Sequence, residues 1–110
     1  MYGGRAPESS DQRVHCIRGL FQESLPRFLE TFESRSPLVV NIDCDLYAST
    51  LFCLTRLDPF IAPGTILILD EFGDVLHEFR AFHDYLAAYR RDYRLLCSHD
   101  DFYTAAVQIV

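Results

Sequence analysis

Two short apolar runs, each ending in acidic residues, constrain the fold of this chain more than any other feature. Residues 38–45 read LVVNIDCD, and residues 65–71 read TILILDE. Apolar runs of this length, rich in β-branched residues, are typical of buried strands in a parallel sheet with helices over both faces. The two runs therefore predict an α/β fold with neighbouring parallel strands.

The acidic residues that close these runs predict a binding site for a cation. Asp43 and Asp45 end the first run, and Asp70 and Glu71 end the second. Ligands of open parallel sheets bind beyond the carboxyl ends of the strands, and consecutive strands are often neighbours. In a fully extended strand, residues two apart point to one face, so Asp43 and Asp45 are expected to lie together. Carboxylates at this range repel, and Mg²⁺, which binds a few carboxylates plus water, is their natural partner.

A plainer interpretation of the same residues stays open at this point. Acidic side chains at the start of a helix accept hydrogen bonds from unpaired N–H groups and interact favourably with the helix dipole. Two acidic pairs after successive strands favour a functional site, but Asp45 could still serve as a helix cap.

Hydrophobic periodicity and turn residues predict the remaining elements. They are a strand at residues 13–18, a helix opened by Ser24 and Pro26, helices over residues 49–57 and 76–89, and a closing antiparallel hairpin of residues 93–97 and 102–110. Residues 1–12 contain Gly, Pro and Ser and are expected to form a flexible N-terminal tail. Residues 13–110 are expected to form one domain.

Composition excludes several partners and indicates a compartment. The net charge of −6 and the isoelectric point of about 5.0 disfavour a nucleic acid partner. No apolar run approaches the roughly 20 residues of a membrane span, so no membrane partner is expected. The four cysteines lack the spacing of a zinc site. Together these features favour a reduced, cytoplasmic protein without disulfides.

Several strings together resemble the macrocin O-methyltransferase family. They are FQESLP at 21–26, IDCDLYAST at 42–50, PG at 63–64, LDEF at 69–72 and HEFRA at 77–81, of which the second is the most specific. The resemblance implies a Rossmann-like class I fold and a methyltransferase that uses S-adenosylmethionine. It also implies Mg²⁺-assisted transfer of a methyl group to a small-molecule hydroxyl acceptor, on a sugar or another natural product. Carried onto this chain, it implies Asp43, Asp70 and Glu71 as metal ligands and Asp45 as the catalytic base.

The resemblance covers only the C-terminal part of the family fold. A glycine-rich cofactor turn after a first strand, which class I enzymes carry, is absent from the sequence, so the cofactor-binding residues are unknown. The chain is therefore expected to be a fragment, with residues 13–110 as a partial methyltransferase domain that is inactive in isolation. The family's strand order places residues 38–44, 65–69, 102–110 and 93–97 side by side in that order. The first of these would carry an open edge, which predicts self-association or a homo-oligomer.

Three alternative functions remain open from the sequence, of which one is a nucleotide-sugar glycosyltransferase, a class that also uses Asp-x-Asp with a divalent metal but usually in a larger, two-domain chain. The second is a non-catalytic fragment or pseudoenzyme that acts by pairing with a complete subunit. The third is a phosphatase of the haloacid dehalogenase type, which also begins with a strand ending in Asp-x-Asp. That class is expected to carry a lysine before its acidic pair, whereas this chain contains no lysine.

Overall fold

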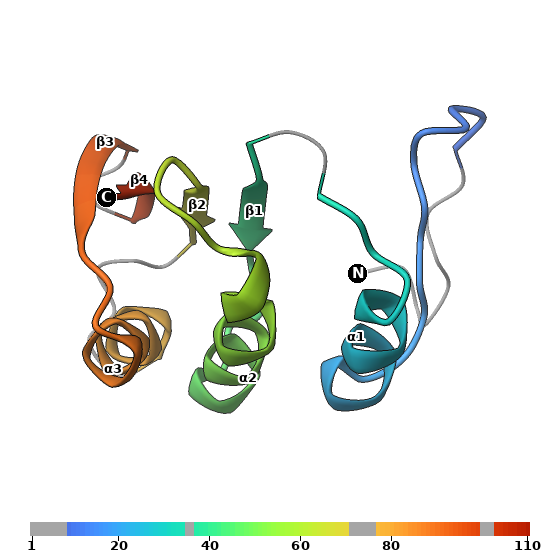
Figure 1. Ribbon diagram of the computed structural model, residues 1–110, viewed down its shortest axis with the longest axis horizontal. Helices are drawn as coiled ribbons and strands as arrows, with labels where there is room; N and C mark the ends of the chain where they lie inside the picture. Colours follow the sequence, from blue (N-terminus) through green and yellow to red (C-terminus); the bar gives the residue numbers. More distant parts are fainter. Residues whose placement is uncertain (1–8, 35–36, 71–76, 100–102) are drawn as a thin grey trace. The chain divides into compact units, whose positions relative to one another are not determined.

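The computed structural model describes residues 9–34, 37–70, 77–99 and 103–110 (Figure 1). The chain divides into two compact units, Met1–Phe32 and Glu33–Val110. The second unit contains all four strands, and its described residues build a mixed α/β domain.

A four-stranded sheet forms the framework of the second unit. The strands are β1 (Val39–Ile42), β2 (Ile66–Leu69), β3 (Tyr93–His99) and β4 (Thr104–Ile109), in the spatial order β1-β2-β4-β3. β1 and β2 are parallel, whereas β4 is antiparallel to both β2 and β3. The predicted strand order and the predicted closing hairpin are therefore confirmed.

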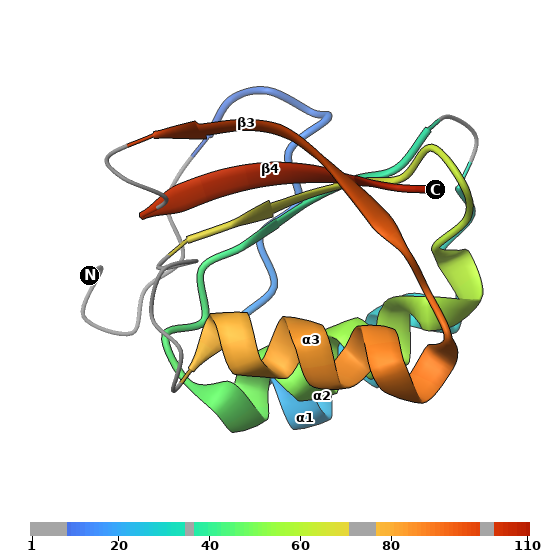
Figure 2. The same ribbon diagram turned by 90° about the vertical axis from the view of Figure 1, so that its left-hand side faces the viewer.

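Two helices cover one face of this sheet. They are α2 (Tyr47–Leu57), which continues into the short 3-10 helix η1 (Asp58–Phe60), and α3 (Glu78–Tyr89). Both lie on the same side of the strands in two perpendicular views (Figures 1 and 2). Helices over both faces of the sheet were expected. In the described part of Glu33–Val110, helices cover only one face.

Burial follows the alternation of the strands. In β2 and β4 every second residue is buried, because successive side chains point to opposite faces. The buried side of the sheet packs against α2 and α3 through a contiguous apolar core, whose members include Ile42, Leu54, Leu67, Leu69, Phe82, Tyr85, Val107 and Ile109. The predicted helices over residues 49–57 and 76–89 are confirmed in type. α2 begins two residues before its predicted start, at Tyr47, and Leu76 lies outside the described residues.

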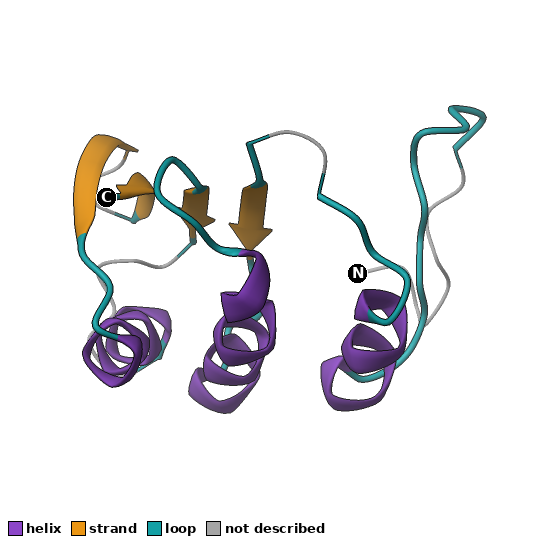
Figure 3. Ribbon diagram, in the orientation of Figure 1, coloured by secondary structure: helices purple, strands orange, loops and turns teal. Residues whose placement is uncertain are grey.

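The predicted strand at residues 13–18 is wrong. Residues 14–18 have no regular secondary structure and are exposed, and they are drawn as loop in Figure 3. A strand is stable only when a neighbouring strand satisfies its backbone N–H and C=O groups. The weak alternation of these residues carried no information about whether such a neighbour exists.

The predicted start of the first helix is also wrong. Helix α1 spans Phe21–Leu29 with Leu20 at its N-cap, so Ser24 and Pro26 both lie inside it. The Ser24 hydroxyl donates a hydrogen bond to the Leu20 carbonyl at 2.9 Å, a bond to the preceding turn that helical serines commonly make. Pro26 removes one backbone donor from the helix interior.

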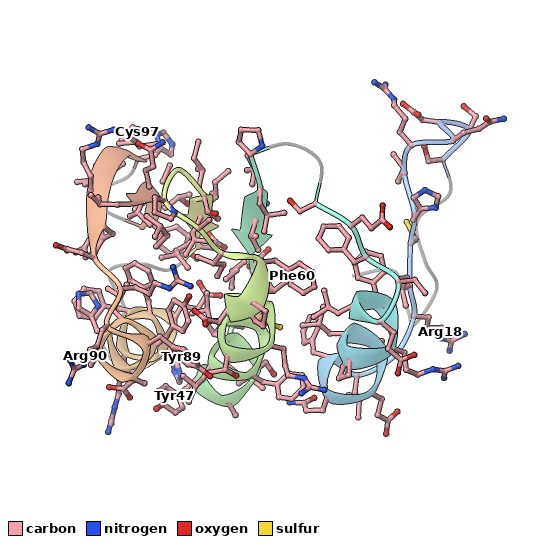
Figure 4. All side chains as sticks on the ribbon, viewed as in Figure 1. Arg18, Tyr47, Phe60, Tyr89, Arg90 and Cys97 are labelled. Carbon is pink, nitrogen blue, oxygen red and sulfur yellow. The ribbon has the colours of Figure 1, made fainter. Side chains whose placement is uncertain are left out.

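All four cysteines are free thiols; Cys53 is buried, and Cys97 is exposed on β3 (Figure 4). None of the described helices has both the length and the apolar character needed to span a membrane.

Candidate metal centre

The pairing of β1 with β2 positions the acidic residues of the two strand ends. Ile42 and Leu69 are partners in the parallel register, so Asp43 and Asp70 follow at the same edge of the sheet. The Asp70 N–H donates to the Ile42 carbonyl at 3.1 Å, which extends the pairing by one residue. The expectation that these two strands are neighbours is confirmed.

The backbone brings Asp43 and Asp45 together in a way that differs from the prediction. β1 ends at Ile42, so the two residues do not lie on an extended strand. Asp45 has a φ of 66°, in the left-handed region that aspartate enters more easily than most residues. The turn that follows the strand, and not strand alternation, therefore sets the directions of these two side chains.

A third carboxylate joins this turn from α3. Asp43, Asp45 and Glu78 each offer one carboxylate oxygen, and these oxygens all lie within 4.8 Å of one another. Glu78 is the first residue of α3 and is fully buried. Its Oε1 accepts hydrogen bonds from the backbone N–H groups of Cys44 at 2.9 Å and Asp45 at 3.1 Å.

Glu78 was not among the site residues predicted from the sequence, although a signal for it is present there. Ala81, Phe82 and Tyr85 follow Glu78 at three, four and seven residues, and all three are buried. Positions with these spacings lie on one face of a helix. A glutamate on the apolar face of an amphipathic helix needs a polar partner, and this one finds it in the turn after β1.

The pKa values of two carboxyl groups reflect the crowding of negative charge. The hydrogen-bonding interaction with Asp70 raises the pKa of Asp43, and burial and the charges of Asp70 and Asp45 raise it further. Burial raises the pKa of Glu78 to about 7, although its two backbone hydrogen bonds act in the opposite direction. Repulsion by Asp70 and Asp43 adds to the increase for Glu78. A divalent cation would relieve this repulsion.

Asp70 is oriented by the neighbouring strand β4, which pairs with β2 through Leu69 and Ala105. The Thr104 hydroxyl, at the start of β4, donates to Asp70 Oδ1 at 3.0 Å. Asp70 also interacts with Asp43, so these two of the three predicted metal ligands lie together. Glu71, the third, lies outside the described residues.

The donor set fits a hard cation such as Mg²⁺. Every ligating atom in the cluster is a carboxylate oxygen, which is the preferred ligand of Mg²⁺, Ca²⁺ and Mn²⁺. Glu78 Oε2 is buried and accepts no hydrogen bond from the described residues. A buried carboxylate oxygen without a partner is the kind of group that a bound cation satisfies.

A side-chain hydrogen bond also joins α2 to α3. The Tyr47 hydroxyl, at the first residue of α2, donates to Asp84 Oδ2 on α3 at 2.6 Å. The Arg80 guanidinium lies 5.6 Å from the centre of the Tyr47 ring. Tyr47, labelled in Figure 4, therefore ties the start of α2 to the first turns of α3.

The fold and the site together describe an α/β protein with an acidic centre at the carboxyl ends of adjacent parallel strands. The family model for Macrocin-O-methyltransferase (TylF) matches residues 7–95. The chain therefore belongs to the macrocin O-methyltransferase family.

Two known proteins are similar to this chain. One is the 8-demethyl-8-(2,3-dimethoxy-alpha-L-rhamnosyl)-tetracenomycin-C 4'-O-methyltransferase of Streptomyces olivaceus, which is 31% identical over 75 residues. The other is the apo structure of CalS11, a TDP-rhamnose 3'-O-methyltransferase of calicheamicin biosynthesis, with a TM-score of 0.66 and 24% identity over 84% of this chain. The chain spans 27% of the length of the first and 40% of the second.

Proposed function

We propose that this chain is the metal- and acceptor-binding part of an O-methyltransferase that uses S-adenosylmethionine and Mg²⁺. The acceptor is proposed to be a hydroxyl group on a sugar or another small natural product. Membership of the macrocin O-methyltransferase family supports the reaction, and the sugar-directed activity named for the Streptomyces olivaceus relative supports the acceptor class. The observation that carries the proposal is the cluster of Asp43, Asp45 and Glu78 oxygens beside Asp70.

The proposed fold of the complete enzyme is the Rossmann-like class I sheet. β1, β2, β4 and β3 would form one side of that sheet, and the fold similarity to CalS11, which covers 40% of that chain, supports this assignment. A cofactor-binding half would pair with the β1 edge. S-adenosylmethionine, held mainly by that half, would supply the methyl group.

The residues of this chain have distinct proposed roles. Asp43, Asp70 and Glu71 would hold Mg²⁺, which would polarise the acceptor hydroxyl and favour its ionised form. Asp45, exposed at the surface beside Asp43, would accept the hydroxyl proton as general base. Thr104 would keep the Asp70 carboxylate oriented through its hydrogen bond to Oδ1. Holding the acceptor in line with the methyl donor would supply much of the rate acceleration.

The metal assignment is tested by titrating the purified chain with Mn²⁺ and following water proton relaxation or heat. The wild-type chain is expected to bind Mn²⁺ or Mg²⁺ in preference to Zn²⁺, because the ligands are oxygen atoms. The double variant Asp43→Asn with Asp70→Asn is expected to lose this binding. Unchanged affinity in the double variant would disprove the assignment.

The cofactor assignment is tested by calorimetry on the same chain. Because the sequence lacks a glycine-rich cofactor turn, the 110-residue chain is expected to bind S-adenosylmethionine weakly and to show no turnover alone. Tight binding by this chain would show that the cofactor site is built from residues within it.

A further inference from the structure

Glu78 has a buried carboxyl group, and its structural contacts explain only one of the two oxygens. Its side chain is fully buried, and the only hydrogen bonds that reach it from the described residues end on Oε1. An ionised carboxylate is costly to bury unless it is paired or coordinates a metal. The two backbone N–H groups could be satisfied equally well by the neutral amide oxygen of a glutamine. The second oxygen of Glu78 therefore needs another explanation.

The position of Glu78 supplies that explanation. The carboxylate contributes an oxygen to the same cluster as Asp43 and Asp45, with all three oxygens within 4.8 Å of one another. Oxygens that share one hard cation at about 2.1–2.5 Å are separated by up to roughly 5 Å. The Asp43 and Glu78 oxygens therefore have a spacing that one cation can bridge, with the Asp45 carboxylate beside them as the base.

We propose that Glu78 is a ligand of the cation site, with Oε1 holding the Cys44–Asp45 turn and Oε2 available to the metal. This inference rests on the proposed function, because it concerns the same cation, and it adds a ligand from α3 to those at the two strand ends. By accepting hydrogen bonds from the backbone N–H groups of Cys44 and Asp45, Oε1 holds the turn, left-handed at Asp45, that brings the two aspartates together. Glu78 thereby couples the position of α3 to the geometry of the site.

Mn²⁺ binding to the full 110-residue chain, measured by electron paramagnetic resonance, tests this assignment. The key variant is Glu78→Gln, which keeps an oxygen acceptor for the backbone N–H groups and removes the charge. Glu23→Gln is the matched control, because Glu23 lies in the first turn of α1 and is exposed. We expect Glu78→Gln to weaken Mn²⁺ binding roughly tenfold or more, and Glu23→Gln to change it by less than about twofold.

The outcomes separate this inference from the proposed function. If Asp43→Asn abolishes Mn²⁺ binding while Glu78→Gln retains wild-type affinity, Glu78 only supports the turn, and the metal site stands without it. If the wild-type chain does not bind Mn²⁺, both proposals fail.

A folding measurement and a second variant distinguish loss of metal binding from loss of folding. Far-ultraviolet circular dichroism reports whether Glu78→Gln is folded, and Glu78→Asp keeps the charge but shortens the side chain by one methylene group. We expect Mn²⁺ to raise the unfolding temperature of the wild-type chain, and to raise that of both variants much less, because a ligand stabilises only the state that binds it. An equal increase in Glu78→Asp would contradict ligation by this residue.

Discussion

Helices α1 and α3 have similar lengths but differ in what they bury. None of the nine residues of α1 is buried, whereas α3 buries Glu78, Ala81, Phe82, Tyr85 and Leu86. Both sequences place apolar residues at helical spacing, and α1 is amphipathic. Helices of this length are marginal in water, so most of their stability comes from packing an apolar face. The comparison shows that an amphipathic pattern marks a face for burial but does not supply the surface against which it packs.

The largest expected difference between the two helices concerns phenylalanine truncation. Phe82 in α3 is fully buried, whereas Phe28 in α1 is 38% exposed. We expect Phe82→Ala to lower the free energy of unfolding by about 3–5 kcal/mol, because it leaves a cavity in the core. Phe28→Ala should cost well under half as much. Urea denaturation followed by circular dichroism measures both; equal losses would show that α1 is as strongly packed as α3.

A second contrast concerns polar contacts, one beneath α3 and one in the N-terminal unit. Asp58 Oδ1 accepts hydrogen bonds from the Tyr85 hydroxyl at 2.7 Å and from Arg91 Nε at 3.1 Å. Removing this acceptor leaves both donors in a largely buried place, so Asp58→Ala should cost about 1–3 kcal/mol.

The control for Asp58 is Asp11→Ala, which breaks the pair of Asp11 with Arg13. Arg13 has a side chain that is 90% exposed. Exposed pairs contribute little because water screens them, so no measurable change in the urea midpoint is expected. A large effect of Asp11→Ala would mean that the N-terminal unit depends on its ion pairs.

A smaller expected effect is the pH dependence of the stability of the folded chain that arises from Glu78, the first residue of α3. The pKa of Glu78 is raised to about 7 in the folded chain. A raised carboxyl pKa means that the folded state holds a proton that the unfolded chain has released. Its contribution to stability is therefore complete below the unfolded pKa and is lost as the pH rises through about 7.

Thermal unfolding without divalent cations measures this contribution. The wild-type unfolding temperature should fall between pH 5 and pH 8, and part of this fall should disappear in Glu78→Gln. The raised pKa of Asp43 acts in the same direction, so the variant should retain some slope. A slope identical to that of the wild type would show that Glu78 does not titrate in this range.

The smallest expected effect on stability concerns the two edges of the sheet. β1 and β3 are the edge strands; Val39 on β1 is 56% exposed, and Leu96 on β3 is 43% exposed. An unpaired apolar edge favours pairing with another chain, and β3 carries Arg94 and His99, which oppose this. Val39→Lys should reduce self-association in sedimentation velocity while changing the free energy of unfolding by less than about 0.5 kcal/mol. Leu96→Lys is the control, and a larger effect there would place the association at β3.

Much of the second unit was predictable from local patterns. The runs at residues 38–44 and 65–69 predicted β1 and β2, and the spacing of Phe79, Phe82 and Leu86 predicted α3. The strand predictions succeeded because short, continuous, β-branched apolar runs are typical of strands, and the helix prediction succeeded because burial of one helix face imposes a period of about 3.6 residues. The spatial order of the strands was predicted through the family resemblance, and the structure confirms it.

The site was predictable only in part. Asp43 and Asp70 could be placed at one edge of the sheet, with Asp45 nearby, because the ends of parallel strands meet there, and their roles stay predictions. Glu78 could not be assigned to the site from the sequence. It joins the turn only through hydrogen bonds to Cys44 and Asp45, which precede it by 34 and 33 positions.

The sequence by itself determined that β1, β2, β4, α2 and α3 form, and it placed acidic residues at two adjacent strand ends. Both properties are local, since each depends on side-chain periodicity and on a few neighbouring residues. Only the tertiary structure decided that residues 13–18 form no strand and that Glu78 completes the acidic cluster. Both of these outcomes depend on whether a distant backbone segment is present to accept or donate a hydrogen bond, and no local pattern encodes that partner.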